Sequence, residues 1–351
     1  MRTVSAADSV SLAIQRTRDL LFRPFTWATY LKLGLVAILT EGFSSNLRSS
    51  GNHAHPSTSG QGPDFGALHE IPHQWIAYIV AGVFALALLM ILALWIAYLV
   101  TRLRFAFFHC LVTSTTEIRP GWHLYRDRAA RFFWLNIVVG LCFLLVIGLI
   151  AIPFVSGFVK LAHDTPPGGH PDWGLLLSLV LPLIPIILLV ALAAVLLDVI
   201  LRDWILPHYA LEDASAGEAW SDVWEAITRE KREFFVYLLL RLILPMIAMI
   251  AIFMVLMIPG LMLAGALAGI EYGIHSAFAD AAGAARFVAI ALEAFFGVVE
   301  AGFALLASIC LGGPVGTAVR EYALVFYGGR YPALGNLLYP PAAAVQGEPE
   351  A

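Results

Sequence analysis

The stretch His69-Glu70-Ile71-Pro72-His73 has the spacing of a zinc-protease motif. In HExxH on a helix, two histidines one turn apart bind zinc and the glutamate acts as general base. Proline belongs in the first turn of a helix and costs about 3 kcal/mol in its interior. We therefore expect a helix that begins near Pro72 and leaves His69 outside it. We interpret the match as fortuitous, and predict no catalytic residue, no cofactor and no enzymatic activity.

A second candidate for metal chemistry is a set of histidines and aspartates in the segments between the apolar runs. The topology argued below places these segments on the outer side of a membrane. Its members are His53, His55, His69, His73, His163, His170, His275, Asp164, Asp172 and Asp280. Imidazole and carboxylate together suit transition metals. The segments that carry them are rich in glycine, serine and proline, which is typical of solvated loops. We interpret these residues as loop residues, and whether they bind metal stays open at this stage.

Charged residues inside apolar segments are the stronger candidates. Glu293 and Glu300 share a helical face with small residues, and Arg241 lies in the preceding apolar segment. A carboxylate within a bilayer is costly unless it is paired, protonated or facing water. We therefore expect Glu300 to face the bundle interior with Arg241 as its partner, either as a structural ion pair or as part of a proton or substrate path. Asp198 and Arg202 mark the exit of another apolar segment and join this set.

The stretch from Asp198 to Phe235 predicts a membrane-surface helix. It begins with Ser215-Ala216-Gly217-Glu218, a capping box in which hydroxyl and carboxylate each satisfy a free backbone N–H. Apolar residues follow at i, i+3, i+4 and i+7, and cations occupy the last turns, where they suit both the helix dipole and anionic headgroups. The predicted lipid contacts are Trp220, Trp224, Arg229, Lys231 and Arg232.

Similar helices precede two other apolar segments. Residues 119–131 place Trp122, a further predicted lipid contact, on one face, and residues 1–25 place Val10, Ile14 and Leu21 likewise. The helices that leave the membrane also share a basic residue next to an aromatic or acidic one, at Arg104, Arg202 and Arg320. These correspondences predict an internal repeat within a single integral membrane domain spanning 1–351. Its units are about 1–104, 105–203 and 204–322, followed by a tail at 323–351.

Composition sets the class of protein. The chain is 60% hydrophobic and 13% charged, whereas a soluble protein has about 25% charged residues. Several apolar runs reach the roughly 20 residues needed to cross a bilayer. We predict an all-α, polytopic membrane helical bundle of three tandem hairpins, each preceded by a cytoplasmic amphipathic helix. The six predicted spans are about 25–43, 75–100, 132–159, 174–201, 234–257 and 287–319, with Pro259-Gly260 breaking the fifth and Gly312-Gly313-Pro314 ending the sixth.

The placement of Lys and Arg predicts the topology. With both termini inside, sixteen of these residues are cytoplasmic and three lie outside. This bias predicts a multi-pass inner- or plasma-membrane protein with cytoplasmic N- and C-termini. Because topology already accounts for the arginines, we predict no nucleic-acid binding. The three cysteines form no paired pattern and predict no disulfide.

The sequence ILPHYALEDASAGEAWSDVWEAITREKREFF resembles a motif of the membrane domain found beside some glycerophosphoryl diester phosphodiesterases and of related uncharacterised bacterial membrane proteins. The shared positions are Leu206, Pro207, Glu212, Ala219, Trp220, Lys231, Arg232 and Phe234. The resemblance is confined to about residues 200–240. It implies a six-span fold with no catalytic role for these residues, since the hydrolase activity in that family belongs to a separate soluble domain.

Two functional classes follow. In the first, the protein is a non-enzymatic membrane scaffold or lipid-interacting protein whose surface helices bind anionic headgroups. In the second, it is a transporter or channel for a small solute or lipid that uses Glu293, Glu300 and Arg241. Membrane lipids are the predicted partners in the first class. Protein partners and homo-oligomerisation are left open.

Overall fold

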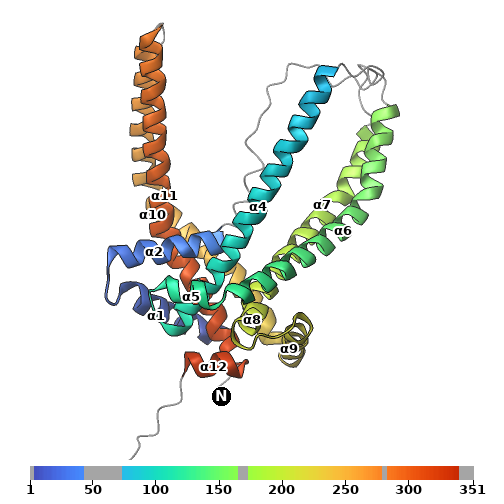
Figure 1. The fold of residues 1–351 in the computed structure, drawn as a ribbon, viewed down its shortest axis with the longest axis vertical. Helices are drawn as coiled ribbons and strands as arrows, with labels where there is room; N and C mark the ends of the chain where they lie inside the picture. The colour runs from blue at the N-terminus through green and yellow to red at the C-terminus, as the bar shows by residue number, and fades with distance from the viewer. Residues whose placement is uncertain (1–3, 43–72, 165–172, 279–282, 340–351) are drawn as a thin grey trace, which may run out of the picture.

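The computed structural model describes residues 4–42, 73–164, 173–278 and 283–339, and the regular structure within these ranges is helical throughout (Figure 1). The elements in chain order are α1 (Ala6–Phe22), α2 (Trp27–Ala37), the π-helix η1 (Ile38–Gly42), α4 (His73–Thr113), α5 (Ile118–Leu124), α6 (Arg126–Asp164), α7 (Trp173–Val199), the π-helix η4 (Ile200–Ile205), α8 (Leu206–Leu211), α9 (Ala216–Arg229), α10 (Lys231–Ala277), α11 (Ala284–Gly328) and α12 (Pro332–Leu338).

Five helices of the described chain are long and apolar enough to cross a membrane, and they identify a multi-pass membrane protein. They are Tyr78–Thr113, Arg126–Leu161, Trp173–Leu211, Lys231–Ala277 and Ala285–Gly328. The first predicted span, 25–43, is not among them. Here α2 has 11 residues and η1 adds 5, fewer than the roughly 20 a span needs. In Figure 1, α2 lies across the lower ends of the long helices.

The long helices rise from a shared base as three arms, formed by α4, by α6 with α7, and by α10 with α11 (Figure 1). We call these the arms, and the lower part with α1, α2, α5, α8, α9 and α12 the base. In the candidate spans of α4, α6, α7 and α10, the most apolar stretch has no buried residue. In α11, 6% of that stretch is buried. Exposed apolar side chains on this scale mark a surface that faces lipid rather than water.

The buried core lies in the base, where the lower ends of α4, α8 and α11 meet. Phe105, Leu206 and Phe326 are each fully buried there. Aromatic rings fill much of this space: Trp204 packs edge-on against Phe234 with ring centroids 4.9 Å apart. The protein is therefore held together at one end of its long helices.

One predicted helix break is wrong, and one predicted end of a span does not end its helix. α10 runs without interruption from Lys231 to Ala277 through Pro259, and α11 continues past Pro314 to Gly328. A proline removes one hydrogen bond, but a helix in apolar surroundings keeps its remaining internal bonds because no water offers an alternative. Both helices therefore extend well beyond the predicted span boundaries.

A close backbone contact fixes α2 against α11. A Cβ atom built on Gly313 would lie 2.5 Å from the Cα of Gly34, and one built on Gly316 would lie 3.4 Å from the Cβ of Ala37. Glycine alone permits the first approach. Because η1 continues directly from α2, this crossing places Glu41 among the helices of the base.

Candidate functional site

Glu41 anchors a buried group of charges in the base. It lies in η1, and its Oε2 accepts hydrogen bonds from Arg202 Nη1 at 2.9 Å and from Arg241 Nη2 at 3.1 Å. The side chains of Glu41 and Arg241 are 11% exposed and that of Arg202 is 5% exposed. One carboxylate therefore joins η1, η4 and α10.

Asp203 is the second centre of this group and is completely buried. Its Oδ2 accepts from the Tyr237 hydroxyl at 2.8 Å and from Arg241 Nε at 3.0 Å, and its Oδ1 accepts from Arg320 Nη1 at 2.8 Å. The same Arg320 nitrogen donates to the backbone carbonyl of Arg202 at 2.8 Å. We call Glu41, Arg202, Asp203, Arg241 and Arg320 the ionic cluster.

The local backbone explains how so many charges reach one place. Glu41 lies in one π-helical segment, and Arg202 and Asp203 lie in another. A π turn is wider than an α turn and shifts the helical register of the side chains, and such turns are frequent at functional sites. In η4, the consecutive residues Leu201 to Ile205 are all buried, which a regular amphipathic helix does not achieve.

The charges nearly balance when the neighbours of the cluster are included. Asp198 pairs with Arg202 at 3.1 Å and is 38% exposed, while Arg104 Nε donates to the carbonyl of Thr40 at 3.4 Å, next to Glu41. Four arginines then face three carboxylates. Arginine does not release its proton in proteins, so the cluster lacks a proton-transferring cation. The ionic cluster is therefore a set of ion pairs that holds several helices together.

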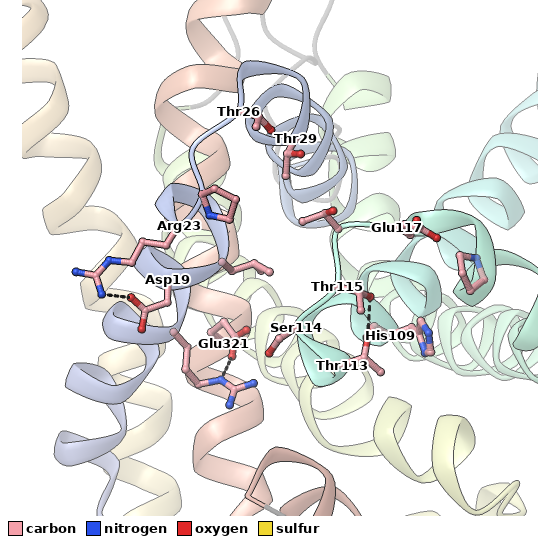
Figure 2. A pocket seen from close by; sticks show the side chains of 15 residues that line it. Asp19, Arg23, Thr26, Thr29, His109, Thr113, Ser114, Thr115, Glu117 and Glu321 are labelled. Atoms are coloured by element: carbon pink, nitrogen blue, oxygen red, sulfur yellow. Dashed lines mark hydrogen bonds and ion pairs between the residues drawn. The ribbon is translucent and has the colours of Figure 1, made fainter.

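A polar pocket lies near the ionic cluster, between the α1–α2 turn, the α4–α5 loop and α11 (Figure 2). Its cavity is about 820 Å³. Arg16 Nε donates to Glu321 Oε2 at 2.9 Å within it, and Asp19 pairs with Arg23 at 3.4 Å. Figure 2 shows the Thr113 and Thr115 hydroxyls joined to each other where α4 ends, on one side of the same pocket. Paired charges and hydroxyls make this a polar pocket with little unbalanced charge.

The structure brings three of the predicted intramembrane residues together and leaves two apart. Arg241, Arg202 and Asp198 all belong to the ionic cluster or its edge. Glu300 is exposed on α11 instead of facing the interior. Its predicted pairing with Arg241 is wrong, because Arg241 contacts Asp203 and Glu41.

The reason for this difference lies in the register of the α10–α11 arm. Tyr237 stacks on Tyr322 with ring centroids 5.0 Å apart, which fixes the level at which the two helices face each other. Arg241 lies one turn from that level, whereas Glu300 lies about 33 Å from it at 1.5 Å per residue. Glu293 lies further along the arm, where its Oε1 is 3.4 Å from His275 Nδ1.

The helix predicted after the Ser215 cap is confirmed as α9, including both hydrogen bonds of its capping box. The backbone N–H of Ser215 donates to Glu218 Oε2 at 2.9 Å, and the bonds from Ser215 lower the pKa of Glu218. Val223 is buried, while Trp220 is 41% and Trp224 is 58% exposed. The two tryptophans therefore lie outside the face that packs on the base.

The basic residues of this region are exposed as well. Lys231 and Arg232 at the start of α10 are exposed, and Arg229 pairs with Glu225 at 2.6 Å on the surface of α9. Exposed cations and exposed indoles are both features of membrane-interface helices. The same region also exposes the carboxylates of Glu212, Asp213, Asp222 and Glu225, so its basic residues are confined to the end of α9 and the start of α10.

The second predicted surface helix is shorter than expected. α5 ends at Leu124, and Tyr125 and Ala129 are buried in the base. The Arg102 guanidinium lies 4.2 Å from the centre of the Trp122 ring, so one face of that ring is covered by protein. Of the two, α9 is the more open surface.

Most of the residues considered as possible metal ligands lie outside the described residues. These are His53, His55, His69, Glu70, His170, Asp172 and Asp280, whereas α4 is described from His73 onward. Among the residues that the structure describes, no three His, Cys, Asp or Glu side chains gather to hold a metal.

Several residues of the cluster were missed from sequence. Glu41 and Asp203 were not among the predicted site residues, and Arg320 was read only as a marker of a helix exit. The signal was present in the recurrence of arginine at three exits, since Arg104, Arg202 and Arg320 converge on the same part of the base. The motif residues Leu206, Ala219 and Phe234 are buried, which gives them a packing role.

Comparison with known proteins yields one family. The model of a family of unknown function (DUF7544) matches residues 4–337. Neither a curated protein nor a solved structure matches the chain.

Proposed function

The chain belongs to this family of unknown function, and we propose that it is a non-enzymatic membrane scaffold that binds anionic lipid at its base. In this proposal the arms cross an inner or plasma membrane, and the base lies at the cytoplasmic surface with both termini. A resemblance to the membrane domains beside phosphodiesterases remains an expectation that agrees with this assignment. The six-span count remains one too, with α2 and η1 as the short first segment.

The observation that carries the proposal is the division of the molecule into exposed arms and a base that the ionic cluster holds together. Asp203 and Arg320 are sealed in the base, whereas the apolar stretches of the arms have almost no protein around them. A scaffold needs a rigid unit at the membrane surface and a wide contact with lipid. The ionic cluster supports the rigid unit, and the exposed arms support the wide contact with lipid.

Charge distribution supports the cytoplasmic placement. Among the described residues, Lys160 and Arg286 lie near the far ends of the arms, while the other lysines and arginines lie in the base or where the arms join it. Lys and Arg concentrate on the cytoplasmic side of membrane proteins. Each basic side chain near an anionic membrane surface adds about 1 kcal/mol of attraction.

The test is lipid selectivity in reconstituted bilayers. Spin-labelled phosphatidylglycerol and phosphatidylcholine report how much of each lipid is held at the protein surface. We expect the wild-type protein to prefer phosphatidylglycerol, and the triple variant Arg229→Gln, Lys231→Gln, Arg232→Gln to lose most of that preference. The control is Ser221→Gln with Thr228→Gln, which adds two glutamines to the same region without changing charge. Equal selectivity in the wild-type protein and the triple variant would reject the proposal.

A transporter remains the second candidate because Glu300 lies on an exposed apolar stretch of α11. A carboxylate in that setting is expensive and therefore a functional candidate. Neither of the two cavities described in this structure is lined by Glu300, which favours the scaffold. Proteoliposomes enclosing a pH-sensitive dye separate the two: proton uptake that is abolished by Glu300→Gln would establish the transporter instead.

A further inference from the structure

An apolar groove separates the N-terminal helix α1 from the lower ends of α10 and α11. Its cavity is about 500 Å³, within the range of small-molecule sites. Ile14 of α1 is 56% exposed, Phe22 is 45% exposed and Ile247 of α10 is 57% exposed, and all three line the groove. The groove therefore opens onto the same apolar surface that the α10–α11 arm presents to lipid.

Two buried hydroxyl groups lie in the wall of this groove without a partner. Thr17 is 5% exposed and Tyr322 is 2% exposed, and both line the cavity. Neither Thr17 Oγ1 nor the Tyr322 hydroxyl has a hydrogen-bond partner among the residues that the structure describes. A buried hydroxyl left without a partner is destabilising, so each calls for an acceptor or donor that the described chain does not supply.

The case of Thr17 is informative because other buried threonines behave differently. Thr40 and Thr317 bond their hydroxyls to the carbonyl four residues earlier, at 2.8 Å and 2.9 Å. This local bond is the usual way a helical threonine satisfies its hydroxyl. The Thr17 hydroxyl makes no such bond and stays without a partner beneath the wall of the groove.

The groove also has a cation at its rim. Arg18 lines the cavity with a side chain that is 58% exposed, and its ion pair with Asp19 is long, at 3.9 Å. Arg241 lines the groove too, but its guanidinium is already held by Asp203 and Glu41. The accessible positive charge of the groove is therefore that of Arg18.

We propose that this groove binds one acyl chain of an anionic phospholipid. The chain lies against Ile14, Phe22 and Ile247, the Thr17 and Tyr322 hydroxyls donate to the ester oxygens, and Arg18 contacts the phosphate. The apolar groove, the two hydroxyl donors and the cation at the rim match, in that order, the acyl chain, the ester and the phosphate of a phospholipid. Continuity with the lipid-facing arm selects a bilayer lipid over a soluble ligand. This inference rests on the proposed function, because it needs the base to lie at the membrane surface.

Native mass spectrometry of the delipidated, detergent-solubilised full chain tests this site. Phosphatidylglycerol, phosphatidylcholine and palmitate are titrated separately. We expect a first phosphatidylglycerol molecule to bind more tightly than later ones and more tightly than phosphatidylcholine. Arg18→Gln lies on an exposed side chain and should weaken only the first phosphatidylglycerol, by about fivefold. Thr17→Val with Tyr322→Phe should weaken both phospholipids by about tenfold.

A blocking variant tests the location. Ala248→Phe fills the groove from α10 and should abolish the tight site, whereas Ala264→Phe, on an exposed part of the same helix, should leave it intact. Tight binding that survives both Ala248→Phe and Arg18→Gln would overturn the proposal, as would palmitate binding as tightly as phosphatidylglycerol. Equal selectivity of the wild-type protein and the triple variant in the spin-label experiment would reject the scaffold but leave a bound structural lipid, so the two failures are distinguishable.

Discussion

At the residue scale, Asp203 is the charge on which the most contacts depend. It accepts hydrogen bonds from Tyr237, Arg241 and Arg320 and has no exposed surface. Removing one partner of a buried ion pair leaves the other charge uncompensated, which costs far more than the net contribution of the pair. Asp198 also faces an arginine, but it is partly exposed, so water compensates for its loss.

We therefore predict that Asp203→Asn destabilises the protein strongly and Asp198→Asn only slightly. The expected loss for Asp203→Asn is about 3 kcal/mol, because the arginines on α10 and α11 lose their shared carboxylate. The apparent melting temperature of the detergent-solubilised protein measures it. A similar, small change for both substitutions would mean that the ionic cluster does not hold the base together.

At the element scale, the position of Glu41 depends on how α2 crosses α11. The crossing is a backbone contact in which Gly313 meets Gly34 with no room for a side chain. Gly302, on the same helix, has nothing within 4 Å of an added Cβ. The two glycines form a matched pair that differs in packing and shares secondary structure.

Gly313→Ala should therefore destabilise the protein by about 1–3 kcal/mol through overpacking. Gly302→Ala should be neutral or slightly stabilising, since alanine is the better helix former by about 1 kcal/mol. Thermal unfolding in one detergent compares them directly. If both alanine variants melt at the wild-type temperature, the α2–α11 crossing is not close-packed in solution.

The elements differ in how far they could be predicted. The capping box and apolar spacing of α9 are local signals, and both are confirmed. The lengths of α10 and α11 were underestimated, because the chain around Pro259 and Pro314 resembles a helix end unless the surrounding lipid is considered. The contacts of Glu41 with Arg202 and Arg241 join residues 161 and 200 positions apart and depend on two π turns, neither of which leaves a periodic pattern in the sequence.

At the scale of the whole molecule, the structure combines a small buried core with long arms that lack protein neighbours. Such an arrangement is stable only where the apolar arms are not in water. Charged side chains avoid apolar surroundings, which explains why most of the arginines lie in the base. The terminal helices α1 and α12 lie at that end too (Figure 1). The family assignment and the five long helices agree with a membrane protein, and the orientation of the base is the claim on which the proposed function depends.

Site-specific labelling from one side of the membrane tests this orientation most directly. One cysteine at a time is introduced at Lys160 or Arg286, near the ends of the arms, or at Arg229 in the base, in a chain carrying Cys142→Ala and Cys310→Ala and keeping the buried Cys110. In spheroplasts of a bacterial host, a membrane-impermeant maleimide should label the two arm positions at once and Arg229→Cys only after permeabilisation. Immediate labelling of Arg229→Cys in sealed spheroplasts, with protection of the arm positions, would contradict the account.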